Sequence, residues 1–337
     1  MGRQTLSVLR ADQLEACEKD LAGLPSRCLF DPDCTDRDAE KLYELSFCAE
    51  EDRRAAGRKH APFLHTVEEL RARVLRIFAS EAALLSLDEH VLMVRAVLFG
   101  GSVVLSDWND LIPARGLVRR LWCRVESFAG QNVLHMPHQL CASALILLAD
   151  KNHKEIRELL TQVHQTIEDT LYLFGAAPVS GPERHMASLL KGSCADGHPE
   201  LIERFLLAGF DYVYDHTGRL LLIHPGLADP ERMMGITRAE MDPESLGKAS
   251  ASLSDLESPL FERLVFLLDG VTRPEISPED AVEDLIILAK QDVPWNDMVE
   301  VLSSLLICQP TPEMLNALKE LSVRIPRWQN LSTSRVQ

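Results

Sequence analysis

The feature that most constrains the fold of this chain is a series of helix-start signals, each followed by apolar residues at helical spacing. Thr66–Glu69 and Ser86–Glu89 have the spacing of a capping box, in which two side chains bond the first backbone amides of a helix. Ser277-Pro278 and Thr311-Pro312 each place a capping residue before a proline at the first helical position. The apolar residues behind these signals recur every three or four positions, which predicts amphipathic helices.

Helix signals occur along most of the chain. Further runs begin at Pro113, Pro137 and Asn152, and Gly100-Gly101 is typical of a helix stop. The run Pro113–Gly130 keeps its apolar residues at helical spacing and predicts a single helix. Aromatic residues make up only 6% of the chain, a bias that favours helices packed by aliphatic side chains.

Strand signals are few. Two apolar runs, Phe210–Tyr214 and Leu220–His224, flank the turn-like Asp215–Gly218 and predict a short hairpin. The predicted fold class is therefore all-α, or nearly so. We expect an irregular helical-repeat array in which this hairpin is the exception.

Changes in pattern along the chain predict four regions. Residues 1–65 read as an N-terminal helical cap or extension, and residues 66–225 as the helical array. Residues 226–253 read as an irregular loop, because clusters of Gly, Pro, Met and Ser interrupt any periodicity. Residues 254–330 read as a C-terminal helical region.

Charge and composition exclude several classes of partner. Asp and Glu outnumber Lys and Arg by 51 to 35, a formal net charge of -16. Such a surface repels nucleic acid and anionic lipid, so the expected partner is a protein with a basic surface. No apolar run approaches the ~20 residues that span a bilayer. Met1–Asp20 does not read as a signal peptide, and the eight cysteines are dispersed, so we expect a cytoplasmic protein with free thiols.

One stretch, Ser188–His224, resembles an ankyrin repeat. Cys194–Ile202 matches the turn between the two helices and the start of the second helix, Phe205–Asp211 matches the end of that helix, and Asp215–Arg219 matches the hairpin finger. The stretch departs from the family at its first helix, where Ser188–Lys191 replaces Thr-Pro-Leu-His. No second good copy follows at the family's period of about 33 residues.

The resemblance implies a protein-binding surface on the finger and the inner helices, and no catalysis. On this resemblance we expect the protein to be a scaffold or adaptor. One kind of protein with this role would be a secreted effector that binds host proteins. Trp108 lies in polar surroundings and is a further candidate for an exposed interface anchor. The candidate binding residues are Phe210, Tyr212, Tyr214, His216, Arg219 and Trp108.

An alternative interpretation is a cysteine-dependent hydrolase or acyltransferase. Cys194 lies near the start of a predicted helix, with His216 and His224 close in sequence, and a thiolate with a histidine partner is what such enzymes need. The ankyrin-like alignment instead places Cys194 where a packed alanine is usual. The chain contains no phosphate-binding or dinucleotide-binding motif, so no cofactor is predicted.

Two groups of residues have the side chains, but not the spacing, of a metal site. The first combines Cys28, Cys34 and Cys48 with His60 or His65, without the paired C-x-x-C of structural zinc modules. The second combines Asp215, His216, His224 and Asp229. The spacing favours no metal at either.

Overall fold

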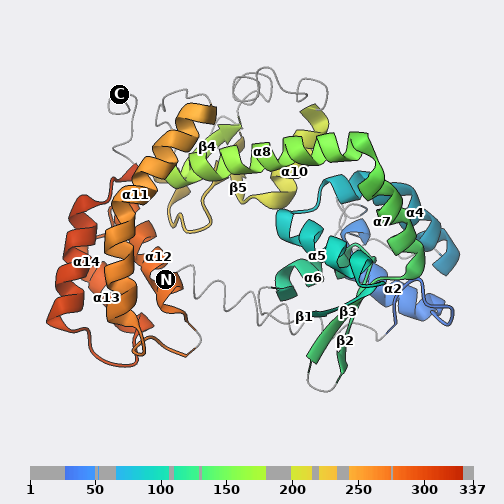
Figure 1. Ribbon diagram of the computed structural model, residues 1–337, viewed down its shortest axis with the longest axis horizontal. Coiled ribbons are helices and arrows are strands. Elements are labelled where there is room, and N and C mark those ends of the chain that lie inside the picture. The colour runs from blue at the N-terminus through green and yellow to red at the C-terminus, as the bar shows by residue number, and fades with distance from the viewer. Residues whose placement is uncertain are drawn as a thin grey trace. The chain divides into compact units, whose positions relative to one another are not determined.

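The computed structural model describes residues 27–49, 52, 66–105, 110–128, 131–179, 199–214, 220–233, 243–274 and 276–328, and helices are its main secondary structure (Figure 1). The helices are α2 (Asp36–Glu44), α4 (Val67–Ala83), α5 (Leu87–Leu98), α6 (Leu111–Arg119), α7 (His138–Ala149), α8 (Lys151–Phe174), α10 (Pro199–Gly209), the 3-10 helix η3 (Pro230–Met233), α11 (Pro243–Leu268), α12 (Pro278–Lys290), α13 (Trp295–Leu305) and α14 (Pro312–Arg324). The strands are β1 (Ser102–Leu105), β2 (Arg124–Phe128), β3 (Gln131–His135), β4 (Ala176–Val179), β5 (Tyr212–Tyr214) and β6 (Leu220–Ile223).

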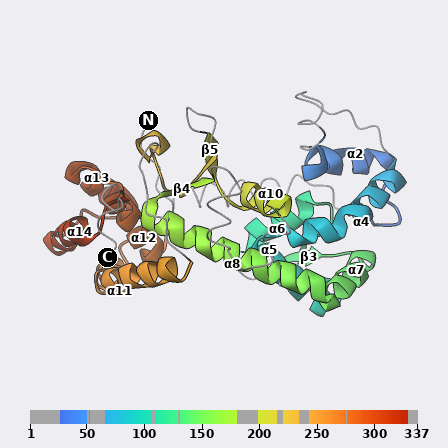
Figure 2. The same cartoon turned by 90° about the horizontal axis from the view of Figure 1, so that it is seen from above.

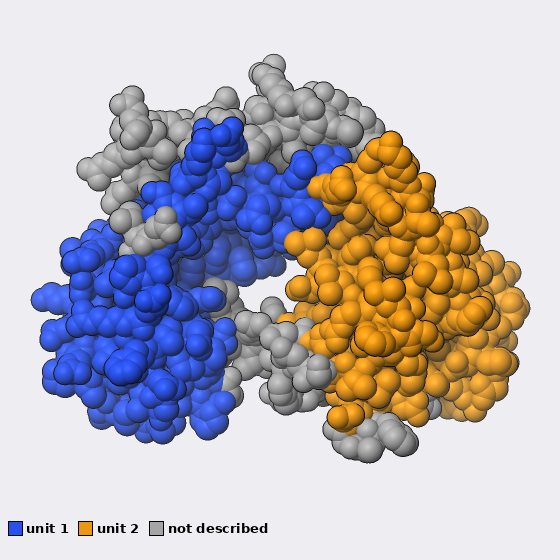
Figure 3. Space-filling view, viewed as in Figure 1, with its two compact units in different colours: residues 1–11, 159–337 blue, residues 12–158 orange. Residues whose placement is uncertain are grey.

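The chain divides into two compact units within α8, between Glu158 and Leu159; Figure 3 colours them separately. This division does not coincide with any of the predicted boundaries at residues 65, 225 and 253. The composition does not change within an uninterrupted amphipathic helix, so the sequence pattern gives no sign of a boundary inside α8. No helix of the described residues is long and apolar enough to cross a membrane.

The unit that precedes Leu159 packs α2, α4, α5, α6 and α7 with a three-stranded antiparallel sheet of order β1-β3-β2. Its core includes Leu70, Phe78, Leu92 and Trp122, all fully or nearly fully buried. The Phe78 and Trp122 rings lie 4.5 Å apart between centroids.

The prediction of one helix over Pro113–Gly130 is wrong. Helix α6 ends at Arg119, and Leu121 follows with a left-handed φ of 64°. The Trp122 amide donates to the Leu117 carbonyl at 3.2 Å and the Leu121 amide to Val118 at 2.8 Å, the bonds of a Schellman stop. Glycine usually occupies the left-handed position of this motif, so a leucine there gave no stop signal. The chain then continues as β2 and β3.

The helix starts predicted from capping residues are confirmed. The Thr66 hydroxyl accepts from the Glu69 amide at 3.3 Å while Glu69 accepts from the Thr66 amide at 2.8 Å. The Ser86 box and the Ser277 and Thr311 caps form in the same way. Gly100, with φ of 74°, ends α5 as predicted.

The unit that begins at Leu159 combines a second antiparallel sheet, of order β4-β6-β5, with helices α10 to α14 and the C-terminal part of α8. Strands β5 and β6 pair antiparallel, so the predicted hairpin strands are confirmed. Strand β4 adds a third strand that no sequence signal indicated. Helices α11 to α14 lie side by side (Figure 1, Figure 2) around a core that contains Leu264, Leu285, Leu302 and Leu318.

Helix α11 overturns part of the predicted loop at residues 226–253. It begins at Pro243 and runs to Leu268 with Pro259 in its interior. Its buried leucines explain why the helix continues past the proline, because they form one stripe along both halves. These are Leu246, Leu253, Leu260, Leu264 and Leu268.

The predicted fold class therefore holds only in its coarse form: the protein is mostly helical, with two small antiparallel sheets. The described part of the ankyrin-like stretch consists of α10 and the strands β5 and β6. Its predicted first helix, from Ser188, lies outside the described residues.

Gly175, which ends α8, offers a test of how tightly this unit is packed. Its φ is +72°, and an added Cβ would lie 2.5 Å from ring atoms of Trp328. Gly270 has a similar φ of +70° but no atom within 4 Å of an added Cβ. We expect Gly270→Ala to lower the free energy of unfolding by about 1 kcal/mol from backbone strain alone, and Gly175→Ala to lower it by about 3 kcal/mol. Urea unfolding measures both, and equal losses would contradict the expected clash.

Candidate functional site

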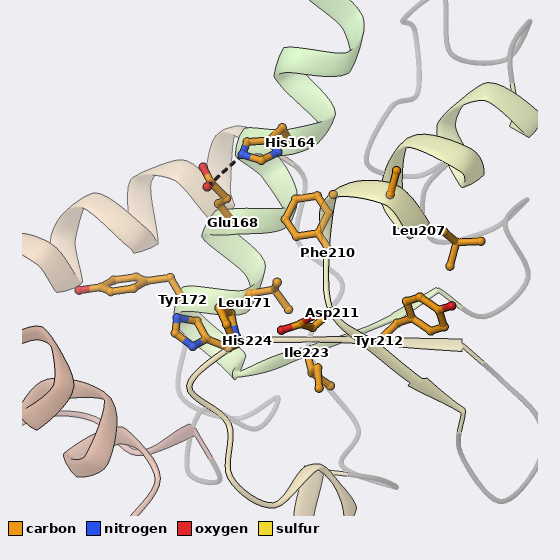
Figure 4. Close-up of a pocket in the computed structure, with 13 residues that line it drawn as sticks. His164, Glu168, Leu171, Tyr172, Leu207, Phe210, Asp211, Tyr212, Ile223 and His224 are labelled. Carbon is orange, nitrogen blue, oxygen red and sulfur yellow. Dashed lines mark ion pairs between the residues drawn. The ribbon is translucent and has the colours of Figure 1, made fainter. Parts of the chain in front are cut away.

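Three of the predicted binding or catalytic residues, Phe210, Tyr212 and His224, line one pocket of about 700 Å³ (Figure 4). Tyr214 lies beside it, 62% exposed, with its ring perpendicular to that of Tyr212 at 6.0 Å. The other predicted site residues lie outside the described residues. These are Trp108, Cys194, His216 and Arg219.

Four elements build this pocket, which we call the α8–α10–β5 pocket. One face of α8 forms a wall, since its contributing residues recur at helical spacing: His164, Glu168, Leu171 and Tyr172. The end of α10 and the start of β5 contribute residues 207–212, and the end of β6 contributes residues 223–225. Because β6 pairs with β5, the hairpin holds these two segments together.

The charged side chains of the pocket are acidic. Glu168 and Asp211 supply two carboxylates, and none of the lining residues that the structure describes is a lysine or arginine. His164 Nε2 lies 3.0 Å from Glu168 Oε1, the contact drawn in Figure 4. Asp211 uses its backbone carbonyl to accept from the Ile223 amide at 2.9 Å, and the residue is exposed. A positively charged group is therefore the ligand that this charge distribution favours.

Aromatic rings line the same pocket as these carboxylates. The Phe210 ring is 5.0 Å from the His164 ring, and Tyr212 is 40% exposed. An aromatic face attracts a cation within about 6 Å of its centroid, by roughly 0.5–2 kcal/mol according to how far the pair is desolvated. Rings and carboxylates in one pocket suit the side chain of lysine or arginine.

His224 is held as a neutral imidazole. Burial lowers its pKa to about 4, and the nearby Lys290 ammonium adds to the effect. Its Nδ1 accepts from the Gly226 amide at 3.1 Å, and its ring lies 5.3 Å from that of Trp328. Since Cys194 and His216 are outside the described residues, pairing of His224 with a nucleophile stays a prediction.

Two of the three cysteines of the first candidate metal group, Cys28 and Cys48, are buried. Burial raises the pKa of the Cys28 thiol to about 11, so this thiol keeps its proton. A thiol must lose its proton to bind a metal. Within the described residues there is no group of three or more His, Cys, Asp or Glu side chains arranged for a metal ion; His60, His65, Asp215 and His216 fall outside them.

Sequence reasoning identified the hairpin side of the pocket and missed the α8 side. The four-residue spacing of His164, Glu168 and Tyr172 places these side chains on one helix face. That spacing was readable in the sequence. Which face of α8 lies against the hairpin is a tertiary property, and no local signal carried it.

Comparisons with known proteins give no match: no protein-family model, curated protein or solved structure is similar to this chain. The ankyrin-like resemblance of Ser188–His224 therefore stays a prediction.

Proposed function

We propose that this protein is a protein-interaction module, a scaffold or adaptor, whose α8–α10–β5 pocket receives a basic side chain of its protein partner. The observation that carries the proposal is the lining of that pocket. The carboxylates of Glu168 and Asp211 lie in one pocket with the rings of Phe210 and Tyr212, without a lysine or arginine among its described lining residues.

Two further properties of the chain support this proposal. The net charge of -16 attracts a basic partner over long range and speeds encounter, an effect that salt weakens. The pocket lies where the end of a helix meets a hairpin, the part of an ankyrin-like unit that the resemblance associates with protein binding. A secreted effector that binds host proteins is one setting for such a module. The cysteine-dependent hydrolase is the alternative, and no described geometry favours it.

The proposal is testable with a labelled peptide. The probe is a fluorescein-labelled octapeptide with two arginines in a glycine-serine background, and the control peptide carries citrulline, which is neutral and nearly the same shape, at both positions. We expect the arginine peptide to bind and its affinity to fall as salt is raised, because the pocket recognises charge. Fluorescence anisotropy measures both peptides, and equal binding of the citrulline peptide would refute the proposal.

Pocket variants locate the binding. Asp211→Asn removes one carboxylate without changing side-chain size, and Tyr212→Ala removes one ring. We expect each to weaken arginine-peptide binding by roughly 3- to 10-fold. Glu203→Gln is the matched control, since Glu203 is an exposed residue of α10 that does not line the pocket. If Glu203→Gln weakened peptide binding as much as Asp211→Asn, the peptide would be attracted by the overall negative charge of the protein and not by this pocket.

A further inference from the structure

A second group of polar side chains is buried where α8, α11 and α12 meet. Lys290 is fully buried, and its Nζ lies 3.1 Å from Glu257 Oε1 and 3.1 Å from the centroid of the Tyr172 ring. The Tyr172 hydroxyl donates to the other Glu257 oxygen, Oε2. Burying an ion pair is costly, and the exchange of one for apolar side chains is often neutral or stabilising, so packing alone does not account for this pair.

A pocket of about 450 Å³ lies against this group, and we call it the α11–α12 pocket. One face of α11 forms one side with Ser254, Glu257, Ser258 and Phe261. Helix α12 forms another side with Glu283, Ile286 and Ile287. Tyr172 and His224 complete it and also line the α8–α10–β5 pocket. Its volume lies within the ~300–1,000 Å³ typical of small-molecule sites.

The charges on this pocket are arranged for a cation. Glu257 and Glu283 line it, whereas the described lining contains no lysine or arginine. Lys290 neutralises Glu257 but is fully enclosed and does not line the pocket, so the negative end of the ion pair faces the cavity. His224 stays uncharged near neutral pH, since burial lowers its pKa to about 4.

Both oxygens of the Glu257 carboxylate have partners within the protein. Oε1 lies 3.1 Å from the Lys290 ammonium, and Oε2 accepts from the Tyr172 hydroxyl. An ionised carboxylate has about four lone-pair sites, so Glu257 can still accept a hydrogen bond from a ligand N–H in the pocket.

We propose that the α11–α12 pocket is a binding site for a small organic amine in its protonated form. The ammonium group lies at the Glu257 and Glu283 carboxylates, and the apolar body of the amine packs on Phe261. Ile286 and Ile287 extend the apolar part of the site. This ligand is a small molecule bound between α11 and α12, whereas the α8–α10–β5 pocket receives a side chain of a protein partner.

Three indole compounds of similar size test the charge requirement. Tryptamine carries an ammonium, tryptophol a hydroxyl and indole-3-propionate a carboxylate at the end of a short side chain. We expect tryptamine to bind the whole protein at least about 10-fold more tightly than tryptophol, and indole-3-propionate to bind most weakly. Isothermal titration calorimetry at pH 7 measures all three. Equal affinities, or no binding of tryptamine, would overturn the proposal.

Variants then distinguish this pocket from the first one. Glu283→Gln removes a charge from an exposed residue, so the fold is retained, and we expect it to weaken tryptamine roughly 3- to 10-fold while tryptophol is unchanged. Glu279→Gln, an exposed residue one turn earlier on α12, is the control and should have no effect. Asp211→Asn should also have no effect. Loss of binding in Asp211→Asn with none in Glu283→Gln would assign tryptamine to the α8–α10–β5 pocket and overturn the proposal.

Discussion

Replacing Glu257 by glutamine is expected to lower the free energy of unfolding of the unit that contains α11 and α12 by roughly 3–5 kcal/mol. The change keeps the size of the side chain but leaves the fully buried Lys290 ammonium without its counter-charge. Burial already lowers the pKa of Lys290 to about 8, an effect that Glu257 opposes. Without Glu257, the lysine must be buried as an uncompensated charge or lose its proton on folding, and each costs free energy.

A double replacement separates charge burial from packing. Glu257→Leu with Lys290→Met removes both charges and keeps apolar volume at the junction of α8, α11 and α12. We expect it to recover most of the lost stability, because buried ion pairs exchanged for apolar residues are often neutral or stabilising. The matched control is Glu244→Gln on the same helix. It breaks an exposed pair with Lys248 at 2.6 Å and should cost less than about 0.5 kcal/mol.

Two measurements check this expectation. Urea unfolding followed by circular dichroism gives the change in stability, and hydrogen exchange read by mass spectrometry shows whether α11 and α12 lose protection first. A loss for Glu257→Gln no larger than that for Glu244→Gln would mean that the ion pair is unimportant for stability. A double variant as unstable as the single one would mean that packing, rather than charge, makes the site sensitive.

Helix α12 shows why part of this architecture was predictable from sequence. The start of α12 depends on Ser277, Pro278 and the acidic first turn, which are neighbours in the chain, so local reasoning was sufficient. The environment of Lys290, at the other end of the helix, depends on α8 and α11. A lysine in the last turn of a helix reads as a solvated group that complements the helix dipole. Its complete burial is a tertiary property without a local signal.

The candidate site was likewise predictable from sequence only in part. Phe210, Tyr212 and His224 were identified because a hairpin brings residues close in sequence to one place. Glu168 and Tyr172 were missed because they reach the pocket only through the packing of α8. Strand β2 was missed for a local reason, since the helix stop at Leu121 lacks the glycine that normally marks it.

Acidification is expected to destabilise the unit that precedes Leu159, because a buried histidine, His153, and a half-buried one, His90, are held in their neutral form. Burial lowers the pKa of His90 to about 4, and the nearby Arg157 guanidinium and His153 add to the effect. Burial also lowers the pKa of His153, which is 4% exposed. Neither Nε2 atom has a hydrogen-bond partner among the described residues, so no acceptor there would hold an added proton.

The direction of the pH dependence follows from these pKa values. Each histidine takes up a proton in the unfolded chain near its ordinary pKa of about 6.5, and in the folded protein only at lower pH. Stability is therefore complete above pH 6.5 and falls as the pH is lowered toward 4. With allowance for the partial exposure of His90, we expect this residue alone to contribute a loss of about 2 kcal/mol between pH 7 and pH 4.

A single substitution isolates this contribution from the protonation of other groups. His90→Leu removes the titrating ring, so its stability should fall by about 2 kcal/mol less than that of the natural chain over the same pH range. His138→Leu, at an exposed position on α7, is the control for exchanging a histidine for leucine. Urea unfolding at pH 7, 5.5 and 4 measures all three proteins. If His90→Leu and the natural chain lose stability in parallel, the ring of His90 is protonated in the folded state without cost, and its burial as a neutral group is excluded.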